Sequence, residues 1–88
     1  MSSMVGGSLE QMQGLEQQLT TDSQTVGELQ RRISAAVSNT TWTGPAAERF
    51  RSEWNGTFVA ALSRLQDALN ENATVVRSRR HAIQTATF

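Results

Sequence analysis

Apolar residues in the first half of the chain recur at alternating steps of three and four positions. One row contains Val5, Met12, Leu19, Val26 and Ile33, and a second row contains Leu15, Leu29 and Ala36. This is the a/d pattern of a heptad repeat, which places apolar side chains along one side of an α-helix. The pattern predicts a first helix over about residues 8–38, preceded by a flexible lead.

The boundaries of this helix are marked by residues that favour helix ends. Ser8 and Gln11 have the spacing of a capping box, in which each side chain satisfies a backbone N–H that has no partner within the helix. At the other end, the polar run 38–41 has no apolar periodicity and is rich in residues that favour turns. We therefore expect a turn over about residues 39–44.

A second helix is predicted over about residues 45–81. Gly44 suits the N-cap and Pro45 suits the first helical position, where its missing N–H has no cost. At 100° per residue one apolar stripe contains Phe50, Trp54, Phe58, Ala61, Leu62, Leu65, Leu69 and Val76. The pair Asn55-Gly56 often marks a hairpin turn, but the stripe continues in phase across it, so we expect the helix to continue.

One charged residue interrupts the apolar rows of the first helix. Asp22 occupies a d position of the heptad pattern. Two interpretations are open: a tolerated position that faces water, or a residue that sets the register or the choice of partner.

Two long helices joined by a short turn pack antiparallel, which predicts an all-α helix-turn-helix hairpin spanning residues 1–88 as a single domain. In this arrangement Glu10 is expected near Arg77 or its neighbours. The second stripe contains large side chains at Phe50, Trp54 and Phe58 and is wider than one helix-helix seam needs. We therefore expect a dimer, in which two hairpins complete a four-helix bundle.

Composition excludes several other ways of stabilising a chain of this size. The 88 residues include no Cys and one His, so neither a disulfide nor a Cys/His metal site is expected. Small domains without such cross-links commonly depend on association with another chain. The N-terminal residues have neither the basic nor the apolar segment of a cleaved signal peptide, and no apolar run is long enough to span a membrane.

The sequence offers little support for catalysis or for nucleic-acid binding. His81 stands alone, the carboxylates are scattered, and no Gly-rich phosphate loop is present, so we predict no catalytic residues, no metal and no cofactor. The group Arg77, Arg79 and Arg80 could contact nucleic acid, but the formal net charge is zero and cations suit a helix C-terminus. Membrane contact stays open, because both helices are amphipathic but need their apolar sides for packing.

The turn carries a short motif. Trp42-Thr43-Gly44 lies between two long amphipathic helices in a chain just under a hundred residues long, followed by Ala46-Ala47 and by Phe50 and Trp54. Over essentially its whole length the chain resembles the WXG family, which includes the early secretory antigenic target and culture filtrate proteins of mycobacteria. Trp42 and Gly44 match the motif residues.

This resemblance implies a substrate of type VII secretion, exported folded and without a cleaved signal peptide to the medium or the cell surface. Members form homodimers, or heterodimers with a paralogue, and their export is driven by a membrane-associated ATPase. The family's export signal, Tyr-x-x-x-Asp/Glu after the second helix, is missing because the chain has no Tyr and its tail 82–88 has no acidic residue. The resemblance therefore favours a heterodimer with a signal-bearing paralogue over a homodimer.

The candidate site residues fall into two groups. The motif residues Trp42 and Gly44 form the turn, where Trp42 could close the end of the bundle or form part of a recognition groove. The expected hairpin or dimer interface contains Leu15, Leu19, Val26, Leu29, Ile33, Phe50, Trp54, Phe58, Leu62, Leu65 and Leu69. The tail 82–88 is expected to be flexible.

Overall fold

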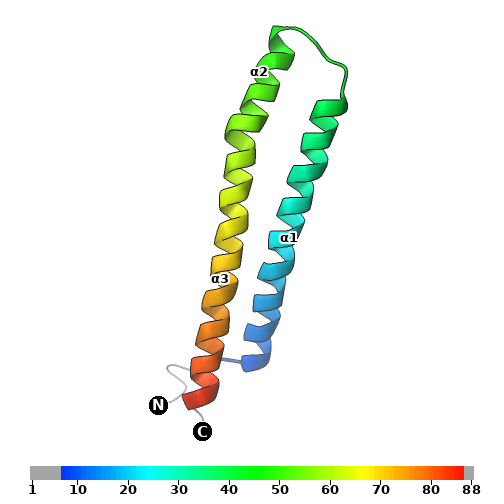
Figure 1. Ribbon diagram of the computed structural model, residues 1–88. Helices are drawn as coiled ribbons and strands as arrows, with labels where there is room; N and C mark the ends of the chain where they lie inside the picture. The colour runs from blue at the N-terminus through cyan, green and yellow to red at the C-terminus, as the bar shows by residue number, and fades with distance from the viewer. Residues whose placement is uncertain (1–6, 87–88) are drawn as a thin grey trace.

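The computed structural model describes residues 7–86, and these form a helical hairpin (Figure 1). Helix α1 (Leu9–Asn39) leads through a loop at residues 40–44 into α2 (Pro45–Glu53), a π-helical turn η2 (Trp54–Phe58) and α3 (Val59–Ala86). The last three elements follow one another without a break and form one long helix, antiparallel to α1. The hairpin measures 65 × 17 × 14 Å. The all-helical hairpin predicted from the sequence is confirmed.

The ends of the helices follow the capping residues. The Ser8 hydroxyl oxygen accepts a hydrogen bond from the N–H of Gln11 at 3.2 Å, so α1 begins at Leu9. Gly44 precedes α2 with φ 110° and ψ 173°, a conformation that strongly favours glycine. Pro45 then occupies the first turn, and the Glu48 N–H bonds to the Gly44 carbonyl at 3.1 Å.

The prediction of a flexible tail after residue 81 is wrong for residues 82–86, because α3 continues to Ala86. Ile83 extends the row of half-buried residues on α3, and its side chain lies close to Gly7 at the start of the hairpin. This contact with the N-terminal end of the hairpin stabilises the helical conformation of residues 82–86. Residues 1–6, including Val5, and residues 87–88 lie outside the described part of the chain.

The Asn55-Gly56 pair does not break the second helix, as expected, but it lies in a π-helical turn. The N–H of Val59 bonds to the carbonyl of Trp54, five residues earlier. The turn therefore holds one residue more than an α-helix would. Phe50 and Phe58 are eight residues apart and would diverge by about 80° on a regular α-helix. Because the π-helical turn takes up one extra residue, Phe50 and Phe58 project from the same side of the helix.

Replacing Gly56 with Ala is expected to stabilise the protein. Gly56 has no positive φ, and a Cβ added there would meet nothing within 4 Å. The substitution then removes the entropic cost of glycine in a helix, about 0.5–1 kcal/mol. Urea unfolding should show a higher midpoint at unchanged slope. Gly44→Ala is the opposite control, because its φ of 110° makes any side chain strained; a stabilised Gly44→Ala variant would contradict the argument.

The seam between α1 and α3 is lined by small and polar residues. The buried residues of this seam are Ser23, Gly27 and Ala73. The Ser23 hydroxyl donates to the Gln66 carbonyl at 3.2 Å. A Cβ on Gly27 would lie 2.8 Å from the Gln66 amide nitrogen, so glycine allows Gln66 to cross here.

The heptad rows of α1 are therefore not centred on the seam. Leu19 and Val26 are half-buried beside it, as are Leu62 and Leu69 on α3. By contrast, Leu15, Leu29 and Ile33 are 50%, 42% and 40% exposed. The helices meet along the column Glu16, Ser23 and Gln30, about 50° round α1 from the row of Leu19 and Val26. Much of the apolar pattern consequently remains outside the hairpin.

Candidate interaction surface

Large apolar side chains on both helices are exposed in a regular way. We define the apolar face as Leu15, Leu29, Ile33, Phe50, Phe58 and Leu65, which are 40–50% exposed. Four of its members directly precede a residue of the seam: Leu15 precedes Glu16, Leu29 precedes Gln30, Phe58 precedes Val59 and Leu65 precedes Gln66. They are thus offset from the seam by the same rotation on both helices.

This common offset places the exposed residues on one side of the hairpin. In two antiparallel helices, positions with the same rotational offset from the seam lie on the same side. The opposite flank carries Arg77, which follows the buried seam residue Ala73 by four positions and pairs with Glu16. The apolar face and Arg77 therefore lie on opposite sides of the seam.

The total solvent-accessible surface is large for a chain of this mass. Its accessible area is 6608 Å², whereas a compact monomer of 9.7 kDa would expose about 5,100 Å². The radius of gyration is 19.5 Å, against about 12 Å for a compact domain of this length. Contiguous apolar surface on an elongated molecule is typical of a protein-binding site.

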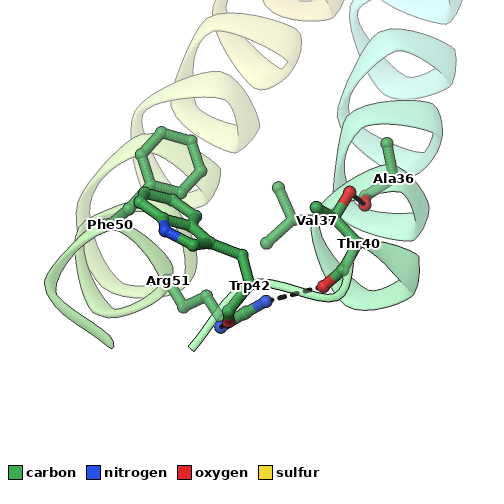
Figure 2. Close-up of a pocket in the computed structure, with 6 residues that line it drawn as sticks. All are labelled: Ala36, Val37, Thr40, Trp42, Phe50 and Arg51. Atoms are coloured by element: carbon green, nitrogen blue, oxygen red, sulfur yellow. Dashed lines mark hydrogen bonds between the residues drawn. The ribbon is translucent and has the colours of Figure 1, made fainter. Parts of the chain in front are cut away.

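The tip of the hairpin presents a second apolar feature. Trp42 is 43% exposed, and its ring lies against Phe50 with centroids 5.9 Å apart at 52° (Figure 2). A shallow pocket of about 160 Å³ lies beside the two rings. It is lined by Ala36, Val37, Thr40, Trp42, Phe50 and Arg51.

Arg51 holds the tip loop, which we define as residues 40–44. Its guanidinium donates to the Trp42 carbonyl at 2.7 Å and to the Thr40 carbonyl at 2.9 Å (Figure 2). These bonds join α2 to the loop and to the residue that caps α1. Together with the φ of Gly44, they fix where Trp42 leaves the hairpin.

At the base of the hairpin, defined as residues 7–16 and 77–86, ion pairs join α1 to α3. Both carboxylate oxygens of Glu16 are paired at 2.8 Å, one with Arg77 Nε and the other with Arg80 Nη2. Glu10 does not make the contact with Arg77 that the sequence suggested, because Glu16 faces α3 and Glu10 is exposed. Hydrogen bonds from Arg77 and then Arg80 lower the pKa of Glu16 below its ordinary value.

Glu16→Gln is expected to destabilise the hairpin at neutral pH and much less in acid. Because the folded-state pKa of Glu16 is depressed, its stabilisation is present above the unfolded-state value near 4.5 and is lost as the pH falls through the folded-state pKa. Urea midpoints measured from pH 7 to pH 2 should converge for the two proteins. Glu10→Gln is the matched control, with little change expected across this range; a constant difference between wild type and Glu16→Gln would contradict this account.

The predicted interface residues thus divide by environment. Trp54 is buried, and its indole N–H donates to the Ser34 hydroxyl at 2.9 Å. Of the other predicted interface residues, the six of the apolar face are exposed, and the rest are half-buried: Leu19, Val26, Leu62 and Leu69. Gly44 forms the turn. Glu16, Ser23 and Arg51 were not among the predicted site residues. The first two occupy the heptad column beside the apolar one, and this spacing could have identified them.

Neither a metal-holding cluster nor a membrane-spanning helix is found among the described residues. Within residues 7–86, no group of three or more His, Cys, Asp or Glu residues is placed to hold a metal ion. None of the helices in this range is both long and apolar enough to cross a membrane. No family model, curated protein or solved structure significantly matches the chain.

Proposed function

We propose that this protein is a WXG-type substrate of type VII secretion that acts through protein-protein interaction, pairing its apolar face with another helical hairpin. The observation that carries the proposal is the pairing of two features on one hairpin. The tip presents Trp42 and Gly44, and one side of both long helices leaves large apolar residues uncovered. A second hairpin on that side would complete a four-helix bundle.

The tail favours a paralogue as the partner. These 88 residues contain no Tyr, and in this proposal a Tyr-based export signal comes from a paralogue. In this proposal the present chain contributes the tip with Trp42, its paralogue contributes the signal, and the secretion ATPase acts on the pair. In this proposal, export takes the protein to the medium or the cell surface.

The alternatives are less well supported by the surface. A nucleic-acid-binding role would use the group Arg77, Arg79 and Arg80, but two of these three cations, Arg77 and Arg80, are paired with Glu16. A membrane-associated role would use the same apolar face that a partner would cover. Salt-dependent binding to DNA, or leakage of liposomes by the purified protein, would favour these alternatives.

The first test is the association state of the chain alone. Size-exclusion chromatography with light scattering, alongside far-UV circular dichroism, should show self-association or incomplete folding that a co-expressed paralogue corrects. A monodisperse, cooperatively melting monomer at micromolar concentration that binds no paralogue would overturn the proposal.

The second test is export from a strain with an active type VII system. The protein should reach the culture medium when a signal-bearing paralogue is present and should stay in the cell when the paralogue or the ATPase is deleted. Trp42→Ala should reduce export while the circular dichroism spectrum stays helical. Efficient secretion from a strain without any such paralogue would contradict the proposed division of roles.

A further inference from the structure

The apolar rows on the two helices are centred near one level of the hairpin. On α1 the heptad rows run from Met12 to Ala36, with their midpoint at residue 24. On the second helix the apolar stripe runs from Phe50 to Val76, with its midpoint at residue 63. Ser23 bonds to Gln66, so residues 23 and 66 lie side by side, and the two midpoints lie within about one helical turn of each other. A two-fold axis perpendicular to the hairpin near this level would place the apolar rows of both helices opposite those of a second copy.

A carboxylate lies almost on that axis. Asp22 directly precedes Ser23 and occupies the same row as Leu15 and Leu29. It is half-buried, and one carboxylate oxygen accepts a hydrogen bond from the Gln18 amide at 2.9 Å. Among residues 7–86 the ion pairs within 4 Å involve only Glu16, so no cation of the same chain neutralises Asp22.

A second copy of the chain would bring two such carboxylates together. In antiparallel pairing of α1 about residue 24, the two Asp22 positions differ by four residues, about 6 Å along the helix. In parallel pairing of α1 they would lie directly opposite each other. Either arrangement places like charges close together in an interface between the two chains from which water is partly excluded, and this opposes association.

We propose that Asp22 determines partner choice: it disfavours self-pairing and selects a hairpin with Lys or Arg at the middle of its own apolar row. This rests on the proposed function, because it concerns the partner of the same apolar face. Leu15, Leu29 and Leu65 supply apolar contact that many helices could satisfy, whereas Asp22 is the charge among them that only a complementary side chain can match.

Self-association of Asp22→Asn tests the repulsion. Asn keeps the oxygen that accepts from Gln18 but removes the charge. Sedimentation equilibrium at low salt should show a homodimer at least about tenfold tighter than that of the wild type. The matched control is Glu28→Gln, which removes one negative charge from an exposed residue of α1 on the side away from the apolar face. It should leave the dissociation constant unchanged.

Charge reversal tests the selection directly. The probe partner is the Asp22→Arg chain, mixed with the wild type and analysed by native mass spectrometry. Mixed pairs should exceed the proportion given by random exchange, and the excess should fall at high salt. A Glu28→Arg chain mixed with the wild type should show no such excess.

The outcomes separate this inference from the proposed function. If Asp22→Asn and wild type dimerise equally well and mixed pairs with Asp22→Arg show no excess, then dimerisation stands and the role of Asp22 is wrong. If the wild type and every Asp22 variant are stable monomers that neither mix nor bind a paralogue, then pairing through the apolar face is itself wrong.

Discussion

Trp54→Ala is expected to abolish cooperative unfolding of the hairpin. Trp54 is only 8% exposed, and it is the largest of the buried side chains in residues 7–86. Its ring contacts Phe58 with centroids 6.3 Å apart, and its N–H bonds to Ser34 across the seam. Truncating a buried Trp costs about 3–5 kcal/mol. Small domains have total stabilities near the lower end of about 5–15 kcal/mol, so little would remain.

Thermal melts followed by circular dichroism at 222 nm, and urea titrations, would measure the effect. Trp54→Phe is the first control, because it keeps the aromatic contact and loses the hydrogen bond to Ser34, which contributes about 1 kcal/mol. Trp42→Ala is the second, because Trp42 is 43% exposed and should cost much less. If Trp42→Ala destabilised the protein as much as Trp54→Ala, the assigned burial of the two residues would be wrong.

Leu29→Glu combined with Leu65→Glu is expected to prevent association with a hairpin partner while the helices stay folded. Both side chains belong to the apolar face and are 42% and 47% exposed. A carboxylate at either position is solvated in the free hairpin but would be buried without a partner in a complex, at a cost of several kcal/mol. Two such charges should weaken binding by about a hundredfold or more.

The measurement is association with a cognate hairpin by isothermal titration calorimetry, with circular dichroism as a check on folding. The matched control is Gln24→Glu with Ser63→Glu, which adds the same two charges at exposed positions outside the apolar face. This control should bind as the wild type does. Equal loss of binding in both double variants would show that net charge, and not the apolar face, governs association.

Local rules account for much of the fold. Ser8 with Gln11, and Gly44 with Pro45, mark the helix starts because their effects depend on neighbours only three or four residues away. The single short loop then leaves antiparallel packing as the compact arrangement of two long helices. The amphipathic rows also identified the candidate surface, since six of the eleven predicted interface residues make up the apolar face.

The π-helical turn shows where local rules were insufficient. Asn55-Gly56 is compatible with a turn, an α-helix or a π-helix. The turn that formed brings Phe50 into line with Phe58 while Trp54 stays buried against Ser34. That choice depends on contacts with α1, twenty residues away in sequence, which local propensity does not contain.

By itself the sequence determined the two helices, the turn between them and the amphipathic pattern, because periodicity and capping act over a few residues. Only the tertiary structure decided which residues face the seam. Ser23 and Gly27 allow α3 to approach closely, and Glu16 pairs with Arg77 and Arg80. These contacts rotate α1 so that its heptad rows flank the seam instead of filling it. A rotation of one helix about its axis leaves its periodicity unchanged, so only contacts with α3 could fix it.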